Sequence, residues 1–267
     1  MTQAIYTETY IRDPESPWLV FLHGFGGSTK MWKKQLSFFR ERYNLLLLDL
    51  PGHGQSRTGI ADLGIRCFED LADVVAETLE CHNIRKACFV CASLGTLVFA
   101  AIQNKYPKLV TGGILCGAVA GISLGLQNLL VILDRIKHRF SSEFLLQLFA
   151  HILLPWRSHA KSRKFFIENG RLLNRREFLA WFSLIVKDID VLKNLSEELN
   201  NVIFISGTED FTFLRGVKRL TSAAARDVKL ILLRRCGHVC SLQRPTEFNT
   251  LSQEFLNENL SPETGTT

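Results

Sequence analysis

The chain has 267 residues, of which 46% are hydrophobic and 22% charged, so it can bury a large core and is not intrinsically disordered. Its net charge of +6 comes from scattered basic residues without a long Lys/Arg tract, which argues against nucleic-acid binding. The seven cysteines lie mostly in apolar runs and the seven histidines show no metal-ligand spacing, so we expect reduced thiols, no metal site and a cytoplasmic location.

The N-terminus MTQAIYTETYIRDPE has no basic segment followed by an apolar one, so no secretion signal is expected. The stretch from Leu109 to Leu133 carries no charged residue and is long enough to cross a bilayer. It contains several glycines together with Thr111, Ser123 and Gln127. We therefore interpret it as a buried strand, a loop and the start of an amphipathic helix, and we expect no membrane span.

Strands and helices are predicted to alternate in the first part of the chain. Continuous apolar runs are typical of strands buried on both faces, and they occur at residues 18–22, 45–49, 87–91 and around Ile114 and Leu115. Helical spacing and end signals predict helices from Ser28 to about Arg40, from Phe68 to Leu79 and from Ser93 to about Lys105.

The second part begins with a block of about residues 119–190 that has helical spacing throughout and is rich in Leu, Phe, Lys and Arg. Alternation then returns, with strands at 202–205 and 228–233 and helices near 212–225 and 245–258. Such alternation predicts a mostly parallel sheet flanked by helices. We therefore predict an α/β core of residues 1–118 and 191–267, with a helical cap (residues 119–190) inserted after the fourth parallel strand.

A predicted strand runs directly into a predicted helix through the residues Cys91-Ala-Ser93-Leu-Gly95. A serine on such a tight turn projects clear of the sheet edge, and the residues two positions before and after it must be small, as in G-x-S-x-G. Ser93 is therefore the candidate nucleophile, and an ordinary helix N-cap is the alternative interpretation. Cys91 is a poorer nucleophile because its thiol would pack inward on the strand.

A serine hydroxyl needs a base to activate it, and the base needs an acid that orients it. His238 follows the strand at 228–233, and Asp210 follows the strand at 202–205. Both therefore belong to the strand ends at which Ser93 also lies, and we predict His238 as the base and Asp210 as the acid. The remaining candidate acids are Glu209, as the fallback, and the weaker Asp188 and Asp190.

The glycine-rich stretch His23-Gly-Phe-Gly-Gly-Ser28 follows the first predicted buried strand. A tetrahedral intermediate needs two N–H donors for its oxyanion, and we expect them from Phe25 and from Leu94, just after the candidate nucleophile. The glycines do not fit the dinucleotide pattern G-x-G-x-x-G. His23 is expected to brace this loop and to take no part in the chemistry.

Together these motifs resemble those of the α/β-hydrolase superfamily, in particular its small single-domain esterases and C–C hydrolases. The resemblance covers roughly residues 15–258 and is carried by HGFGGS (23–28), DLPGHGQS (49–56), CASLG (91–95), GTED (207–210) and CGH (236–238). It implies the α/β-hydrolase fold with a helical cap. It also implies that Asp49, His53 and Ser56 belong to a structural turn beside the site and take no catalytic step.

By this resemblance, the chain is expected to be a serine hydrolase that cleaves a carboxylic ester or thioester through an acyl-enzyme, without a cofactor. An esterase that removes a methyl ester from an acyl carrier protein is one specific form of this expectation. Two alternatives remain open. The first is cleavage of a C–C bond or a lactone by the same residues, and the second is a non-enzymatic ligand sensor that retains them.

The cap combines large apolar side chains with an excess of positive charge. Its helical stripes are expected to line an acyl pocket, with Phe140, Phe178, Trp181 and Phe182 as the candidates. The cap contains eleven basic and six acidic residues. One interpretation is a solvated basic face. The other is that Arg171 and Arg175 meet an acidic substrate or partner, such as an acyl carrier protein, coenzyme A or an anionic membrane surface.

Overall fold

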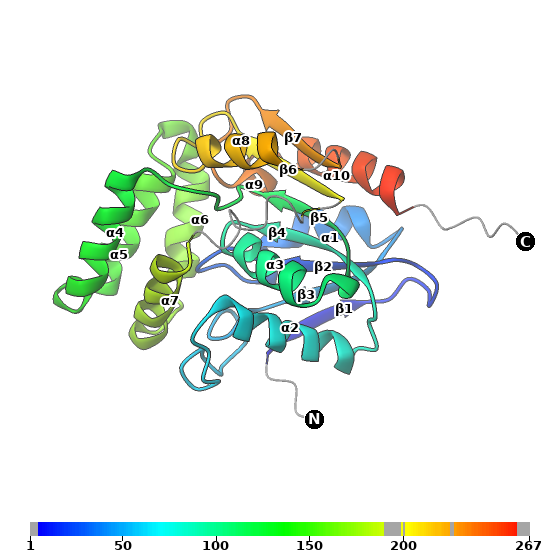
Figure 1. Cartoon of the computed structure of the whole chain (residues 1–267), viewed down its shortest axis with the longest axis horizontal. Coiled ribbons are helices and arrows are strands. Elements are labelled where there is room, and N and C mark those ends of the chain that lie inside the picture. Colours follow the sequence, from blue (N-terminus) through cyan, green and yellow to red (C-terminus); the bar gives the residue numbers. More distant parts are fainter. Residues whose placement is uncertain (1–4, 190–198, 200, 225–226, 261–267) are drawn as a thin grey trace, which may run out of the picture.

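The computed structural model describes residues 5–189, 199, 201–224 and 227–260 (Figure 1). Within these residues, seven strands form one sheet in the order β1-β3-β2-β4-β5-β6-β7. The strands are β1 (Thr7–Tyr10), β2 (Trp18–Leu22), β3 (Asn44–Leu48), β4 (Ala87–Ala92), β5 (Val110–Cys116), β6 (Val202–Gly207) and β7 (Val228–Leu233). All neighbouring pairs are parallel except β1 and β3. The predicted mostly parallel sheet is confirmed.

The edge strand β1 is an element that the sequence did not predict. It pairs antiparallel with β3, with Tyr10 opposite Leu45, and has no strand on its other side among the described residues. Its sequence, Thr-Glu-Thr-Tyr, is polar and only partly buried. An edge strand needs no continuous apolar run, so it lacks the signal by which the central strands were found.

Both faces of the sheet are covered, which explains why the central strands are apolar throughout. In β2, Val20 and Leu22 belong to one buried cluster, whereas Leu19 and Phe21 belong to another. Helices α2 (Phe68–Cys81), α3 (Leu94–Lys105) and α8 (Leu214–Ala223) pack on the first cluster. Helices α1 (Lys33–Phe39) and α10 (Pro245–Asn259) pack on the second. Burial on both faces removes the alternation of apolar and polar residues that a half-exposed strand shows.

The helix expected to begin at Ser28 differs from the prediction. The chain instead forms a 3-10 turn (Thr29–Trp32) that continues into the short α1. The Ser28 side chain makes no capping bond. Instead, the backbone N–H of Thr29, the first residue of the turn, donates a hydrogen bond to Asp49 Oδ1 at 2.6 Å. A carboxylate from a distant loop therefore fixes this start, which local sequence signals do not report.

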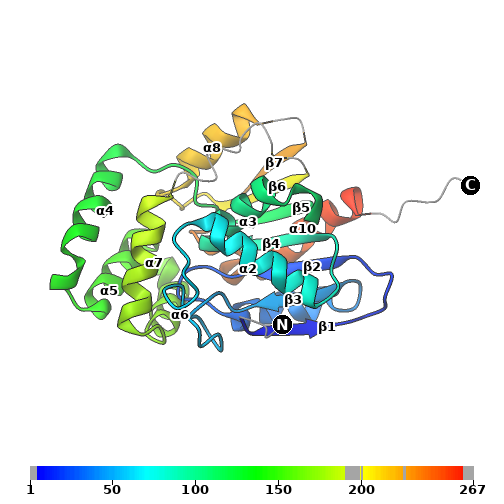
Figure 2. The ribbon, with the colours of Figure 1, turned by 60° about the horizontal axis from the view of Figure 1, so that its bottom comes forward.

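Among the described residues, the cap forms four α-helices between β5 and β6: α4 (Leu124–Ile136), α5 (Ser142–Leu153), α6 (Ala160–Gly170) and α7 (Arg175–Lys187). Three of them begin at side chains that accept a hydrogen bond from the first turn, namely Ser123, Ser141 and Asn174. Figure 2 shows the four helices gathered beside one end of the sheet. The exact division into core and cap at residues 118/119 and 190/191 stays a prediction, since residue 190 lies outside the described part of the chain.

Shorter helical elements complete the connections. They are the 3-10 turns Pro107–Leu109, Lys137–Arg139 and Arg157–His159 and the helix α9 (Cys240–Gln243). The uncharged stretch of residues 109–133 divides into β5, a loop and the first part of α4, as expected. Among the described residues, none of the helices combines the length and the apolar character that crossing a membrane requires.

The register of the sheet brings the carboxyl ends of the parallel strands to one edge. Leu22 of β2 lies beside Cys91 of β4, and Ala92 lies beside Cys116 of β5. Cys116 in turn lies beside Ile205 of β6. In an open α/β sheet, ligands bind at this edge, and the loops that follow β2, β4, β6 and β7 meet there.

Candidate active site

Ser93 is the single residue that joins β4 to α3. Its backbone has φ 48° and ψ −115°, a conformation that residues with a Cβ rarely adopt. Its N–H donates to Cys116 O at 3.0 Å, which anchors the turn to the neighbouring strand. A Cβ added to Gly95 would lie 2.4 Å from Leu22 O, so only glycine fits there. The tight turn and the need for a small residue at position 95 are the geometry that the sequence predicted.

Cys91, two positions before Ser93, lies fully buried inside β4. Burial and the neighbouring Cys88 raise the pKa of its thiol well above the usual value, so it stays protonated. Cys88 and Cys91 have the C-x-x-C spacing, but they belong to the clusters on opposite faces of the sheet, and both are free thiols. Cys91 is therefore a packing residue, and it fills the place of the first glycine of the motif.

The structure brings Ser93, His238 and Asp210 into direct contact. His238 Nε2 lies 2.8 Å from Ser93 Oγ, and His238 Nδ1 lies 2.8 Å from Asp210 Oδ2. The carboxylate is an acceptor, so Nδ1 carries the proton, and Nε2 is left free to accept the Ser93 hydroxyl proton. The side chains of His238 and Asp210 are almost fully buried. This arrangement matches the geometry required of a nucleophile, a base and an orienting acid.

The protonation of His238 is set by two opposing effects. Burial disfavours the charged imidazolium and lowers its pKa, whereas the charge of Asp210 and the hydrogen bond to it raise the pKa. The second effect prevails, and the pKa of His238 lies above the usual 6.5. Asp210 therefore stabilises the imidazolium that proton transfer from Ser93 would create.

The loops that hold the acid and the base pack tightly on each other. Asp210 follows a turn closed by its own N–H and Gly207 O, and its Oδ1 accepts the N–H of Phe213 at 3.3 Å. A Cβ added to Gly207 would lie 2.1 Å from Cys236 O, in the loop before His238. The close packing of these two loops fixes the distance between Asp210 and His238.

The other candidate acids lie elsewhere. Glu209 Oε2 contacts His159 of the cap at 2.9 Å, although Glu209 is the direct neighbour of Asp210. Asp188 caps the C-terminal end of α7. Asp190 lies outside the described residues. Among the described carboxylates, Asp210 is therefore the one that contacts His238.

The two backbone N–H groups expected to bind an oxyanion flank Ser93. Phe25 and Leu94 line the same cavity as Ser93, and within the described part of the chain neither N–H is engaged in a hydrogen bond. Leu94 is the first residue of α3, so it has no acceptor within its helix. A Cβ added to Gly24 would lie 3.2 Å from Ser93 Cβ, so the glycine loop approaches Ser93 closely.

The histidines near this loop act as braces. His23 is buried, bonds Gly24 O through Nδ1, and accepts the N–H of Leu50 through Nε2 at 2.9 Å. His53 Nε2 accepts the N–H of Gly26 at 3.0 Å. Neither ring is among the contacts of Ser93 in the described structure, in keeping with the structural role expected of both.

The motif DLPGHGQS forms a turn that supports the glycine loop. The two carboxylate oxygens of Asp49 accept the N–H groups of Thr29 and Gln55. Ser56 Oγ donates to the Asp49 carbonyl. The side chains of Asp49 and Ser56 thus bond backbone groups, which fits the structural role expected of them.

A cavity of about 100 Å³ opens from Ser93 between the cap and the core. Its walls come from the glycine loop, α3, α4, α5, α6, α7 and the segment after Asp210. The side chains are almost all apolar: Phe25, Leu94, Leu97, Val119, Ile122, Leu126, Leu130, Phe149, Ile152, Leu153, Phe166, Phe182, Ile185, Val186, Ile189 and Phe213, with Ser93 and Thr212 as the polar members. We call this the larger cavity.

Of the aromatic residues predicted to line an acyl pocket, Phe182 alone lies in the larger cavity. The other three do not line it, and their part in substrate binding stays a prediction. Phe178 is buried behind Phe25, with ring centroids 5.3 Å apart. Trp181 is buried and donates its indole N–H to Pro51 O. Phe140 stacks on Phe144. Helical spacing shows which residues share a face, but it does not show which neighbour that face meets.

The two arginines expected to meet a substrate bind the cap itself. The Arg171 guanidinium makes two hydrogen bonds to the Glu143 carboxylate, and Arg175 donates to the carbonyls of His138 and Phe140. Neither arginine lines a cavity at Ser93. In the structure, Arg171 and Arg175 join parts of the cap, and their contact with a substrate or partner stays a prediction.

A smaller cavity of about 40 Å³ meets Ser93 from the other side. Its walls combine the glycine loop, β4, β5, α6 and the His238 loop, and they include Met31, Cys116, Phe165 and Val239. Ser93, Phe25 and Phe166 line both cavities. Ser93 therefore lies where the two cavities meet. Among the described residues, no group of three or more His, Cys, Asp or Glu side chains is arranged to hold a metal ion.

Comparison with known proteins decides the family. The profile of the α/β-hydrolase family matches residues 19–251. The chain belongs to this family. The match spans the glycine loop, the turn at Ser93, the cap, Asp210 and His238, so the fold predicted from the motifs is confirmed.

Two curated relatives are 2-succinyl-6-hydroxy-2,4-cyclohexadiene-1-carboxylate synthases. That of Escherichia coli O9:H4 (strain HS) is 41% identical over 118 residues, which cover 43% of this chain and 42% of the synthase. That of Citrobacter koseri is 44% identical over 93 residues, which cover 34% of this chain and 35% of the synthase. The chain thus matches less than half the length of these synthases.

Several solved structures share the whole fold with this α/β hydrolase. MenH from S. aureus has a TM-score of 0.79 at 17% identity and covers 98% of this chain and 100% of its own. The enol-lactonase from Burkholderia xenovorans LB400 has a TM-score of 0.74 at 19% identity, with coverages of 95% and 96%. The esterase EaEST from Exiguobacterium antarcticum has a TM-score of 0.78 at 15% identity, with 95% of each chain covered. At such identities the likeness shows the fold alone.

Sequence reasoning missed most of the cavity walls and one cap residue beside the site. Phe149, Ile152 and Leu153 line the cavity from α5, and their spacing of three and four residues was the signal that could have grouped them. His159 lies against the loops of Asp210 and His238. A lone histidine between two cap helices carries no sequence signal for that position.

Proposed function

We propose that this α/β hydrolase is a serine hydrolase that cleaves an ester or thioester of an apolar acyl group through an acyl-enzyme. The observation that carries the proposal is the contact of Ser93, His238 and Asp210 at the mouth of an apolar cavity. A nucleophile with its base and acid in place supplies the chemistry. An apolar space next to the nucleophile supplies the binding of an acyl chain.

Acylation begins when Ser93 Oγ attacks the acyl carbon. His238 Nε2 takes the hydroxyl proton, and Asp210 stabilises the resulting imidazolium through Nδ1–H. The negative charge that forms on the carbonyl oxygen is held by the N–H groups of Phe25 and Leu94. His238 then gives its proton to the leaving alcohol or thiol, which departs and leaves the acyl group on Ser93.

Deacylation repeats these steps with water. His238 takes a proton from the water molecule as it attacks the acyl carbon, and returns that proton to Ser93 Oγ as the acid leaves. We assign the acyl chain to the larger cavity and the leaving group to the smaller one, because Ser93 lines both. The mechanism requires no cofactor.

The lining of the larger cavity favours an apolar acyl group over an anionic one. Among its described wall residues none is charged, and Ser93 and Thr212 are the polar members. A carboxylate moved from water into such a space would lose its hydration without gaining a cationic partner. The apolar walls instead gain free energy with every methylene group that they bury.

The matched synthases give a second candidate, a reaction other than ester hydrolysis on the same three residues. The name of their product, 2-succinyl-6-hydroxy-2,4-cyclohexadiene-1-carboxylate, includes carboxylate groups. The uncharged cavity of this chain offers no partner for them among its described wall residues. We therefore rank the synthase reaction, together with C–C cleavage and lactone opening, below ester or thioester hydrolysis.

The proposal is tested with p-nitrophenyl esters and acyl thioesters of increasing chain length, from acetyl to dodecanoyl. We expect kcat/KM to rise with chain length until the cavity is filled, and Ser93→Ala to reduce turnover by about 10⁴-fold or more while the melting temperature stays close to that of the wild type. A fluorophosphonate should label Ser93 and no other residue. Absence of both turnover and labelling in the folded protein would favour the ligand sensor and overturn the proposal.

A further inference from the structure

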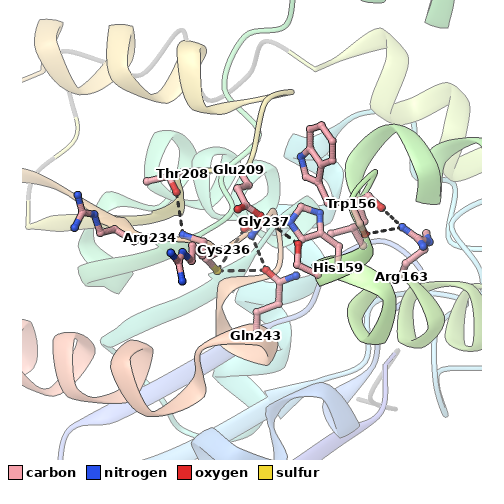
Figure 3. A network of polar contacts seen from close by, with 12 residues as sticks. Trp156, His159, Arg163, Thr208, Glu209, Arg234, Cys236, Gly237 and Gln243 are labelled. Atoms are coloured by element: carbon pink, nitrogen blue, oxygen red, sulfur yellow. Dashed lines mark hydrogen bonds and ion pairs between the residues drawn. The ribbon is translucent and has the colours of Figure 1, made fainter.

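A histidine of the cap, His159, lies against the two loops that carry Asp210 and His238 (Figure 3). It is the last residue of the 3-10 turn Arg157–His159, just before α6. Its side chain is fully buried, and its Nε2 lies 2.9 Å from Glu209 Oε2. A buried histidine of the cap thus makes a polar contact with the partly exposed residue next to the catalytic acid.

The His159 ring also touches the loop of the catalytic base. A Cβ added to Gly237 would lie 2.7 Å from His159 Cε1 and Nε2, so the ring packs directly on the Gly237 backbone. The N–H of Glu209 donates to Cys236 O at 2.8 Å, which ties the two loops together beside the ring. The residues in contact with His159, Glu209 and Gly237, are the immediate neighbours of Asp210 and His238.

Gly237 is held from its other side by α9. Its N–H donates to Gln243 Oε1 at 2.6 Å, and Cys236 Sγ contacts the same oxygen at 3.3 Å (Figure 3). The backbone that precedes His238 is therefore clamped between Gln243 of the core and His159 of the cap. Loss of the cap contact would free one side of this backbone.

The cap side of the contact is braced as well. The Arg163 guanidinium donates to the carbonyls of Leu154 and Trp156, and the N–H of His159 donates to Trp156 O at 3.1 Å. The Trp156 ring meets the Phe211 ring edge-on, with centroids 6.0 Å apart. Phe211 directly follows Asp210, so this cap segment contacts the acid loop on both sides of the acid.

The contact with Glu209 is the polar contact that orients the His159 ring. Within the described part of the chain, His159 Nδ1 is buried without a hydrogen-bond partner. The carboxylate of Glu209, about a quarter exposed, also receives a long hydrogen bond from Ser158 Oγ at 3.4 Å. Removing Glu209 would leave a buried imidazole with no polar partner, which destabilises its present position.

We propose that His159 and Glu209 form a latch that joins the cap to the loops of Asp210 and His238 and so positions His238 for proton transfer. Both are positioning residues, because neither lines a cavity at Ser93. The kinetic consequence of the latch rests on the proposed hydrolase function. When the cap lies on the core, the His159 ring contacts the backbone of Gly237 and its bond to Glu209 fixes Glu209 beside Asp210. Closure of the cavity and alignment of His238 therefore occur together.

The test compares His159→Ala, Glu209→Ala and the double variant by steady-state kinetics with the best p-nitrophenyl ester. We expect each single change to lower kcat by about tenfold with KM changed by less than about twofold, because a displaced base slows proton transfer without altering the acyl cavity. The double variant should be no slower than the slower single variant, since both changes break one contact. The matched control is His151→Ala, which changes an exposed cap histidine whose Nδ1 bonds Gln147 O of its own helix.

Conservative variants separate positioning from loss of folding. Glu209→Gln keeps an oxygen that accepts from His159, and His159→Gln keeps an N–H donor, so both should retain more than about half of the wild-type kcat. Melting temperatures of all variants identify any that fail to fold. Glu209 is partly exposed, so Glu209→Ala is the variant least affected by packing.

A second readout does not depend on turnover. The His238 Nδ1 proton, hydrogen-bonded to Asp210, should give a low-field proton resonance in ¹⁵N-histidine-labelled protein. We expect this signal to broaden or shift in His159→Ala and Glu209→Ala, and to remain in His151→Ala. Unchanged kcat together with an unchanged resonance in both latch variants would overturn the latch, as would fully additive losses in the double variant. A wild-type protein without esterase activity but with a resonance sensitive to His159 would retain the latch and reject the proposed function.

Discussion

Ser93 holds a backbone conformation that costs about 1 to 3 kcal/mol, and the surrounding structure has to supply this energy. The bond from Ser93 N–H to Cys116 O and the glycine at position 95 are two features that allow it. The sequence could predict this tight turn because a strand that runs directly into a helix leaves a single residue for it. It could not predict the partner of Glu209, since that partner comes from the cap, about 50 residues earlier in the chain.

The assignment of the acid can be tested by two changes of the same kind at adjacent positions. Asp210→Asn should lower kcat/KM by about 10³- to 10⁴-fold, because the neutral amide no longer stabilises the imidazolium and favours the wrong tautomer of His238. Glu209→Gln should lower it by less than about threefold, since Glu209 bonds His159. Steady-state kinetics on one ester would decide, and a larger loss in Glu209→Gln would reassign the acid.

The pH dependence of kcat/KM reports the pKa of His238 in the free protein. His238 must be neutral to take the Ser93 proton, so activity is present above its pKa and is lost as the pH falls through it. Asp210 raises this pKa, so we expect the midpoint of the acid limb above pH 6.5. In the residual activity of Asp210→Asn the limb should move to lower pH, because the Asp210 charge that raises the pKa of His238 is lost while burial still lowers it. A limb that stays in place would assign the titration to another group.

At the scale of helices and strands, predictions were best where burial is continuous. The runs at β2, β3, β4 and β6 were found because strands covered on both faces are almost entirely apolar. The partly buried edge strand β1 was missed, and so was the 3-10 turn after β2, whose start is fixed by the Asp49 carboxylate. The cap helices were predicted as helices, but Phe140, Phe178 and Trp181 turned out to face neighbouring cap and core residues, because the tilt of a helix is set by its packing.

Helix α4 offers a matched pair of residues for testing the acyl cavity. Leu130 lines the larger cavity, whereas its neighbour Leu129 is exposed. Leu130→Trp should fill part of the cavity and lower kcat/KM for decanoyl esters by about tenfold or more, with acetyl esters affected by less than about threefold. Leu129→Trp should change neither. Equal effects of Leu130→Trp on short and long esters would place the acyl chain elsewhere.

At the scale of the whole molecule, the cap holds most of the net positive charge and lies over the edge of the sheet where the loops of Ser93, Asp210 and His238 meet. Arg175 bonds neutral carbonyls and so adds positive charge to the cap surface, whereas the charge of Arg171 is balanced by Glu143. An acidic partner such as an acyl carrier protein is therefore a proposal. It rests on the net positive charge of the cap and not on a defined pocket.

This proposal predicts a difference between two kinds of substrate. From about 50 mM to about 500 mM salt, kcat/KM for an acyl group on an acidic carrier protein should fall by about tenfold, while that for a p-nitrophenyl ester should stay constant. Neutralising Lys161 and Lys164 on α6 should weaken the carrier reaction alone. The matched control neutralises Lys218 and Arg219 on α8, outside the cap. Salt dependence that is the same for both substrates would reject the carrier protein.

The sequence by itself determined the parts of this protein that follow from local chemistry and strand order. Its apolar runs define the parallel sheet, its small residues around Ser93 define the turn, and the ends of β4, β6 and β7 carry Ser93, Asp210 and His238 to one edge. These features follow because parallel strands share one edge for their carboxyl ends.

Only the tertiary structure decided what surrounds that edge. It turned Phe178 and Trp181 away from the cavity, held Arg171 and Arg175 on the cap, and placed His159 against Glu209 and Gly237. Each of these contacts joins segments that are distant in the chain, and its formation depends on how the cap helices pack on the core. Periodicity records which side chains share a face of a helix, and packing alone selects what that face meets.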